Sequence, residues 1–344
     1  MTAVMTSDDP GGTIGGVRVP TVEGMEKNTA HARSEPVDPS ASASATGSLP
    51  RPRLPVGVRV LLPLLLLLPA AAASALPASL PGVAAALNRP DALGAAAYAL
   101  VSATSLLAFV LFAVLLVRLV DRRPLATLGL RPGARAAGAL LLGVLVSVLA
   151  MAAAAAVGGL TGIARTFPEG DLEQAAGAGV PLAVILSIVL LRAFVLQGIG
   201  EELLFRGYLL QTLSHRPVTA VLVSAVAFTI PHLASGGGQQ GVGERLLYLA
   251  MPFGFALSAG LLAIALRSVW AGIGIHGGFH IANALAGALG LHVDGPGAWV
   301  LLGSAHLLAA VLIGVLIPHR RWAQVREHGP YSRGSEDPAV QSSS

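Results

Sequence analysis

Two adjacent glutamates and an arginine interrupt a strongly apolar part of the sequence. Glu201, Glu202 and Arg206 closely follow the mainly apolar residues 181–199. On insertion scales, one charged side chain at the centre of a membrane helix costs roughly 2.5–3.5 kcal/mol, so such residues need a partner or a function. Glu202 and Arg206 are four residues apart and face each other on a helix, which predicts a structural ion pair. Glu201 points about 100° away from that pair, and we therefore predict that Glu201 carries the chemistry.

Two further groups of polar residues lie in apolar stretches later in the chain. His232 comes four residues after Phe228, so both side chains lie on one face of a helix. His276, His280 and Asn283 are spaced i, i+4 and i+7, and they form one polar stripe on an otherwise apolar helix. The polar residues within the apolar half of the chain thus gather in three short segments.

A carboxylate and several imidazoles inside a membrane suggest hydrolysis. A glutamate in a low-dielectric cavity is poised as a general base, a histidine opposite it can hold the same water, and further imidazole or amide groups can donate hydrogen bonds to an oxyanion. The alternative is a Zn²⁺ site with Glu201, His232, His276 and His280 as ligands. Gln197, four residues before Glu201, is a candidate for orienting that carboxylate.

The elements that must position these residues are membrane helices. Of the 344 residues, 54% are hydrophobic and 12% are charged, whereas an average soluble chain carries about 25% charged residues. The apolar residues come in runs of about 20, the length that a helix needs to cross a bilayer. The sequence predicts an all-α, polytopic transmembrane bundle in a lipid bilayer. The absence of cysteine excludes disulfides and thiolate sites.

We predict eight spans and three regions. Residues 1–54 are rich in small and polar residues and form a disordered cytoplasmic tail; residues 55–318 form the membrane domain, with the motif-bearing core at about 181–290; residues 319–344 form a short cytoplasmic C-terminal tail. Ala and Gly dominate the third span, which favours close helix packing. The predicted spans are 56–76, 95–119, 136–159, 181–200 and beyond, 218–234, 246–266, 269–289 and 298–317.

The arginines between the spans predict the orientation. The net charge of +4 comes from short arginine clusters before the first span and after the second, fourth, sixth and eighth. This pattern is not a nucleic-acid-binding signal, and by the positive-inside rule it places both termini in the cytoplasm. The Ala-, Gly- and Arg-rich composition is typical of a GC-rich bacterial genome, which predicts a bacterial plasma membrane.

The three motifs do not converge if every span is a straight helix with these bounds. Glu201 then lies near the cytoplasmic interface and His232 lies toward the other side. Convergence requires that the fourth span continue through Leu210, that the fifth begin outside the bilayer, or that Pro231 distort the end of the fifth.

The three motifs, in this order and on successive apolar helices, resemble the CAAX prenyl protease and bacteriocin-processing family of intramembrane proteases. The resemblance rests on E-E-x-x-x-R at 201–206, F-x-x-x-H at 228–232 and H-x-x-x-H at 276–280. It covers about residues 185–285 and implies endoproteolysis inside the membrane.

The resemblance also implies roles for single residues. It assigns Glu201 and His232 to water activation, and His276 and His280 to the oxyanion. His280 stands where the family usually has asparagine. A histidine can still donate a hydrogen bond to the oxyanion, and it is a better metal ligand than asparagine. Asn283, one turn further on, is a substitute donor. The substrate implied is a membrane-associated peptide or protein.

Two other functions stay open at this point. Intramembrane glutamate and histidine also build proton relays, so a proton-coupled transporter is one alternative. Carriers often have repeats in both halves, whereas the polar residues here lie only between Glu201 and Asn283. The second alternative is a membrane immunity or scaffold protein without turnover. His306 in the eighth span and the Gly-rich segment 235–240 are interpreted as structural.

Overall fold

The computed structural model describes residues 51–166, 179–236 and 238–332. The predicted N-terminal tail lies outside this range up to residue 50, and the last twelve residues of the predicted C-terminal tail lie outside it as well. The described residues form an all-α bundle, as predicted, and its two strands are only two residues long. The elements before residue 165 are α1 (Val56–Ala72), α2 (Ala75–Ala78), α3 (Pro81–Leu87), α4 (Ala92–Leu115), η1 (Leu116–Val120), η2 (Leu125–Leu128) and α5 (Ala134–Thr161).

The second part of the chain carries all three motifs. In chain order its elements are β1 (Arg165–Thr166), α7 (Leu182–Leu190), η3 (Leu191–Gly198), α8 (Ile199–Glu202), η4 (Leu203–Leu209), α9 (Leu210–Thr212), α10 (Pro217–Thr229), η5 (Ile230–Ala234), α11 (Val242–Tyr248), α12 (Ala250–Leu266), α13 (Val269–Ala288), β2 (Leu291–His292), α14 (Pro296–Leu316) and α15 (His319–His328).

Seven helical stretches of the described residues are long and apolar enough to cross a membrane. They agree with seven of the eight predicted spans. The remaining predicted span, 269–289, is α13, a helix of 20 residues that is not among the seven. Its sequence contains His276, His280, Asn283 and several glycines, which lower its mean hydropathy. The seven stretches are Val56–Ala78, Ala92–Val120, Ala134–Thr161, Leu182–Thr212, Pro217–Ala234, Val242–Leu266 and Pro296–Leu316.

Exposed apolar side chains cover the outside of these helices. Leu65, Leu107, Leu141, Leu182 and Val315 are all exposed although each belongs to a long apolar helix. Contiguous exposed apolar surface of this kind marks an interaction site in a soluble protein. Here it lies along the helices that are long enough to span, where lipid tails would cover it.

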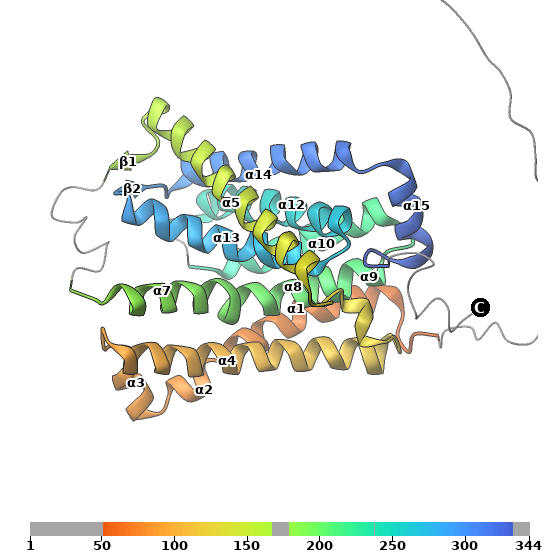
Figure 1. The fold of residues 1–344 in the computed structure, drawn as a ribbon, viewed down its shortest axis with the longest axis horizontal. Helices are drawn as coiled ribbons and strands as arrows, with labels where there is room; N and C mark the ends of the chain where they lie inside the picture. The colour runs from red at the N-terminus through yellow and green to blue at the C-terminus, as the bar shows by residue number, and fades with distance from the viewer. Residues whose placement is uncertain (1–50, 167–178, 237, 333–344) are drawn as a thin grey trace, which may run out of the picture. The chain divides into compact units, whose positions relative to one another are not determined.

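α5 crosses α13 at a position where both backbones come into contact. A Cβ atom at Gly274 would lie 2.1 Å from the carbonyl oxygen of Leu140, and one at Gly143 would lie 2.3 Å from that of Ala271. Only glycine therefore permits this approach. The prediction that the small residues of the third span allow close packing is confirmed, and Figure 1 shows the diagonal crossing of α5 over α13. The crossing fixes where the histidines of α13 lie.

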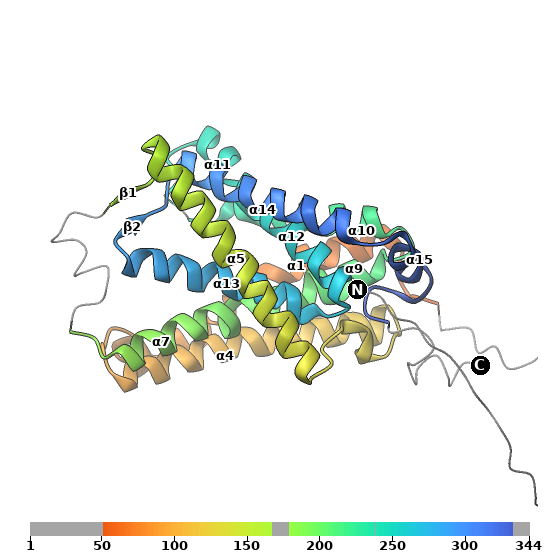
Figure 2. The same cartoon turned by 45° about the horizontal axis from the view of Figure 1, so that its top comes forward.

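The bundle has two distinct ends. In Figures 1 and 2, β1 and β2 lie at one end, and α15 lies at the other. The two strands pair antiparallel, with Arg165 opposite His292 and Thr166 opposite Leu291. In both views α4 and α7 run side by side. We call these the strand end and the α15 end.

The C-terminal residues up to 332 pack onto the bundle. Arg321 of α15 is buried; its Nε donates to the carbonyl oxygen of Ile264 at 3.0 Å, and its Nη2 donates to that of Pro330. Tyr331 is also buried, and its hydroxyl donates to the carbonyl oxygen of Arg206 at 2.7 Å. The sequence predicted only a short tail here, whereas this segment contacts the helix that carries the first motif.

Candidate functional site

The first motif lies on one continuous helical stretch, Leu182–Thr212. The stretch contains two π-helical segments, η3 and η4, and between them the short α-helical segment α8 that carries Glu201 and Glu202. π-helical turns re-aim side chains and are frequent at functional sites. The π-helical segments therefore lie directly on either side of the two glutamates.

Two of the three adjustments that would allow the motifs to converge are present. The fourth span continues past Leu210 to Thr212, and the fifth ends in the 3₁₀ segment η5, which contains Pro231. Glu201 lies 11 residues before Thr212, and His232 lies 15 residues after the next helix begins at Pro217. Thr212 and Pro217 are the two ends of the short connection between these spans. Counted from that connection at about 1.5 Å per residue, the levels of Glu201 and His232 along the bundle differ by only about 6 Å.

One cavity of about 540 Å³ brings the predicted site residues together. Glu201, His232, His276 and His280 all line it. The other predicted members that line it are Phe228, Gln197 and Asn283, and Arg192 lines it as well. The three helical stretches that contribute these residues are separate in the sequence, so the cavity is a product of the tertiary fold.

Glu201 faces the cavity without a hydrogen bond from any described residue. It lines the cavity and is only partly buried, whereas its neighbour Glu202 is fully buried. Gln197 also lines the cavity, but its Oε1 has no partner in the described part of the chain and no hydrogen bond joins it to Glu201. The Glu201 carboxylate is therefore available to a bound water or substrate.

His232 is fixed by the residue one turn before it. Its Nδ1 lies 2.9 Å from the carbonyl oxygen of Phe228, and the two rings are 4.9 Å apart. Because a carbonyl oxygen only accepts, Nδ1 is the donor in this contact. A neutral His232 then carries a lone pair on Nε2 and can accept a hydrogen bond there.

His276 and His280 stack on each other along α13. Their ring centroids are 5.5 Å apart with 27° between the planes. His276 is buried, and its Nδ1 lies 3.4 Å from Oε1 of Glu202. The contact of His276 with the second glutamate of the first motif was not predicted, since it joins two helices 74 positions apart in the chain.

Glu202 and Arg206 form a buried ion pair. Arg206 Nη1 donates to Glu202 Oε1 at 2.6 Å, and both side chains are fully buried. Arg206 also donates to the carbonyl oxygen of Ala256 at 3.1 Å and lies over the Phe228 ring at 4.7 Å. The guanidinium therefore ties together the helices that carry the first and second motifs.

Close approach of α13 requires a glycine beside this ion pair. A Cβ atom at Gly272 would lie 2.5 Å from Oε2 of Glu202. That oxygen has no hydrogen-bond partner among the described residues. The carboxylate is thus bonded through one oxygen only.

Other residues line the cavity toward the strand end, and the motifs did not predict them. Trp299 Nε1 donates to Asp294 Oδ1 at 2.7 Å, and the Tyr248 ring lies 5.3 Å from the Trp299 ring. Ser235 and Gly236, from the segment interpreted as a connector, line the cavity as well. Because Gly236 and Asp294 are exposed, the cavity reaches the surface at this end. Ser235 and Asp294 are polar residues just outside the predicted spans, whereas Tyr248 and Trp299 lie within them and carried no signal of a site.

His306 lies outside the cavity. Its Nδ1 is 3.1 Å from the Ser258 hydroxyl, and both residues are fully buried. The Phe255 ring lies 5.5 Å from that of His306 and 5.2 Å from that of His276. His306 therefore packs behind Phe255, in agreement with its structural interpretation.

The residues proposed as zinc ligands share the cavity but do not form a ligand set. Within the described part of the chain, no three His, Asp or Glu side chains are arranged to hold one metal ion. His276 instead faces Glu202 and stacks on His280. The zinc alternative stays a prediction, and no step below uses a metal.

The fold and this cavity define an integral membrane protein with a polar site enclosed by its helices. Residues 183–282 match the family model described as Type II CAAX prenyl endopeptidase Rce1-like. The match confirms the resemblance that the three motifs indicated, and it includes every residue of those motifs. The family is one of membrane proteases. No curated protein matches the chain.

Proposed function

We propose that this protein is an intramembrane endopeptidase that uses Glu201 as its general base. The observation that carries the proposal is the convergence of Glu201, His232, His276 and His280 on one cavity of about 540 Å³. An imidazole that accepts through Nε2, as at His232, suits the positioning of a water beside the Glu201 carboxylate. Phe228, bonded to His232 through its carbonyl oxygen, is a supporting residue.

In the proposed reaction, water adds to the carbonyl carbon of the scissile peptide bond. Glu201 takes one proton from the water as its oxygen forms the new C–O bond, and the carbonyl oxygen becomes an oxyanion. Glu201 then gives the proton to the leaving amide nitrogen as the C–N bond breaks. The products are a free carboxyl group and a free amine.

His276 and His280 are proposed as the oxyanion donors. The Nδ1 atom of His276 faces the Glu202 carboxylate at 3.4 Å, so Nδ1 is best occupied by a proton. Nε2 is then the atom of His276 that we propose faces the oxyanion. Through this contact, Glu202 is proposed to position His276 in addition to pairing with Arg206. Asn283 lines the same cavity and is a supporting donor.

The proposed substrate is a membrane-associated peptide or protein that enters from the strand end, because the cavity reaches exposed residues there. Arginine-rich loops lie at the other end, around residues 122–135 and 267. By the positive-inside rule we propose that both termini are cytoplasmic, in a bacterial plasma membrane, and that the substrate approaches from the non-cytoplasmic side.

The deciding experiment compares the full-length wild type with Glu201→Gln in membranes. The peptides released from membranes with and without the protein identify a substrate, whose cleavage rate is then measured. Glu201→Gln keeps the shape and loses the base, so we expect a rate lowered about 10²–10⁴-fold at an unchanged unfolding temperature. Glu244→Gln is the matched control, since Glu244 does not line the cavity. A Glu201→Gln variant with most of the wild-type rate would show that Glu201 is not the base. A binding or transport protein would release no peptide.

A further inference from the structure

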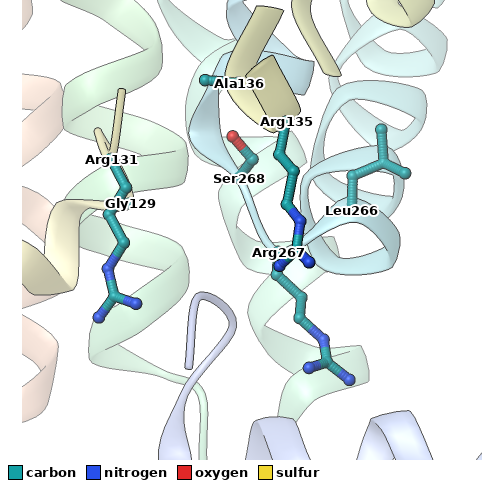
Figure 3. Close-up of a pocket in the computed structure, with 7 residues that line it drawn as sticks. All are labelled: Gly129, Arg131, Arg135, Ala136, Leu266, Arg267 and Ser268. Atoms are coloured by element: carbon teal, nitrogen blue, oxygen red, sulfur yellow. The ribbon is translucent and has the colours of Figure 1, made fainter. Parts of the chain in front are cut away.

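Two hollows lie next to each other at the α15 end, away from the cavity of the proposed active site. The first, of about 100 Å³, is lined by Arg131, Arg135 and Arg267 together with four other residues: Gly129, Ala136, Leu266 and Ser268. In Figure 3 the three arginines come from different segments, and their guanidinium groups point to the same side of the pocket. We call this hollow the arginine pocket.

The arginine pocket concentrates positive charge. No acidic residue is among the residues that line it. Arg135 lies in the first turn of α5, where the backbone dipole adds to the positive potential. Burial, and then the nearby Arg267 charge, lower the pKa of the Arg321 guanidinium to about 10. Within the pocket itself, Arg135 and Arg267 carry like charges, and an anion between them would offset their repulsion.

The second hollow is apolar and shares a residue with the first. It measures about 370 Å³ and is lined by Arg131 and nine residues without a charged side chain: Val110, Ala113, Val114, Leu125, Ala126, Leu128, Leu130, Pro132 and Leu203. We call it the apolar groove. Its residues come from α4, from the segment after η1 and from η4, the π-helical segment that directly follows Glu202.

We propose that the arginine pocket and the apolar groove together bind one anionic phospholipid. The phosphate of the headgroup lies at Arg135 and Arg267, and one acyl chain lies in the groove beside Leu203. A free anion would use the pocket but not the groove, and a neutral lipid would use the groove but not the pocket. The arginine pocket and the apolar groove share Arg131. Together they match a ligand that has both an anionic headgroup and an acyl chain. Its place at the arginine-rich end fits the anionic inner leaflet.

The binding test uses the purified full-length protein in zwitterionic detergent. Phosphatidylglycerol, phosphatidylcholine and glycerol phosphate are added at equal concentrations, and bound lipid is counted by native mass spectrometry beside the unfolding temperature. We expect phosphatidylglycerol to bind and to raise the unfolding temperature, with weaker binding at high salt. Equal binding of phosphatidylcholine would refute the role of the arginines. Equal stabilisation by glycerol phosphate would show that the ligand is a free phosphate ester and overturn the lipid proposal.

Two variants test the two hollows separately. Arg135→Gln with Arg267→Gln should weaken phosphatidylglycerol binding about 25-fold, since each guanidinium near an anionic lipid contributes about fivefold. The control removes the same charge from exposed positions of α15, Arg320→Gln with Arg326→Gln, and should bind normally. Equal losses in both double variants would mean that general surface charge, and not the pocket, holds the lipid.

Ala126→Phe should fill the groove, because Ala126 lines it and is exposed. We expect it to lower phosphatidylglycerol binding at least tenfold, with Ala152→Phe on the exposed face of α5 as the control. Unchanged binding in Ala126→Phe would show that the acyl chain does not lie in the groove. Should a variant fail to fold, the comparison of the three ligands on the wild type still decides the proposal.

Discussion

Two buried carboxylates, Asp121 and Glu202, meet arginines in different ways. Asp121 lies at the α15 end, just after the second span, and both of its oxygens are used. Oδ1 accepts from Arg59 at 2.5 Å and from the Tyr208 hydroxyl at 3.3 Å. Oδ2 accepts from Arg123 and, at 2.9 Å, from Thr212. Glu202 has one bonded oxygen, and its Oε2 has no partner among the described residues.

The difference separates a fully bonded cluster from one that belongs to the proposed active site. Burial alone would raise the pKa of the Asp121 carboxyl, but the Arg59 and Arg123 guanidiniums hold it below its ordinary value. Buried polar groups in stable proteins are nearly all satisfied, as Asp121 is. Glu202 is less completely satisfied, and it lies between Arg206 and the cavity-lining His276. An unsatisfied buried oxygen calls for an explanation, and at Glu202 we propose that the carboxylate is held to position His276.

The largest expected effect on stability comes from breaking the Glu202–Arg206 pair. Arg206→Ala should lower the free energy of unfolding by about 3–5 kcal/mol, because the buried Glu202 charge loses its main partner. Glu202→Ala should cost a similar amount. The double variant should be less destabilised than either single one, and thermal unfolding with protein yield measures all three. Damage in the double variant that equals or exceeds that of the singles would argue against mutual pairing.

The Asp121 cluster provides the matched comparison. Arg59→Ala removes one guanidinium, but Asp121 keeps Arg123, Thr212 and Tyr208. We therefore expect Arg59→Ala to be less destabilising than Arg206→Ala and to leave the cleavage rate unchanged. An equal loss of stability in both variants would remove the distinction between the two clusters.

The next effect concerns the cleavage rate and His280. If His280 donates to the oxyanion, His280→Ala should lower the rate about 10²–10³-fold, while His280→Asn should keep much of it because an amide also donates. If His280 binds a metal, both variants should lose activity, since amides are poor ligands for such ions. The exposed His215→Asn is the control. Stoichiometric zinc in the wild type, lost together with activity in His280→Asn, would end the oxyanion assignment.

Contacts within one helix were predictable from the sequence, and contacts between helices were not. The i, i+4 rule predicts the Glu202–Arg206 pair and the common face of Phe228 and His232, because helix geometry fixes them. The contact of His276 with Glu202 depends on how α13 crosses its neighbours, which Gly274 and Gly272 allow by backbone approach. Spacing along the chain does not encode that crossing.

The convergence argument already allowed the fourth span to continue through Leu210, but its π-helical segments were outside the reach of the sequence pattern. A π turn changes the hydrogen-bond register without a distinctive residue type, so η3 and η4 cannot be distinguished from α-helix by periodicity. The arrangement of 319–332 was missed for another reason. This segment is polar and short, and its anchors, Arg321 and Tyr331, are recognised only by the partners they reach.

The smallest expected effect tests whether this C-terminal anchor supports the first motif. The Tyr331 hydroxyl donates to the Arg206 carbonyl oxygen at 2.7 Å, and its ring packs so closely on Gly129 that a Cβ there would lie 2.6 Å away. Tyr331→Phe removes the hydrogen bond and keeps the ring, so it should lower the free energy of unfolding by about 1 kcal/mol. Tyr98→Phe is the control, since the Tyr98 hydroxyl makes no hydrogen bond within the described part of the chain.

Combining Tyr331→Phe with Arg206→Ala tests whether the C-terminal anchor stabilises the protein through Arg206. Tyr331 bonds to the backbone of Arg206, on the helix that holds the Glu202 carboxylate. If the anchor supports the pair, Tyr331→Phe should cost less in the Arg206→Ala background than in the wild type, because the helix is already loosened there. Unfolding of the two single variants and the double variant gives this coupling directly. Additive losses would mean that Tyr331 stabilises the end of the bundle independently of the candidate active site.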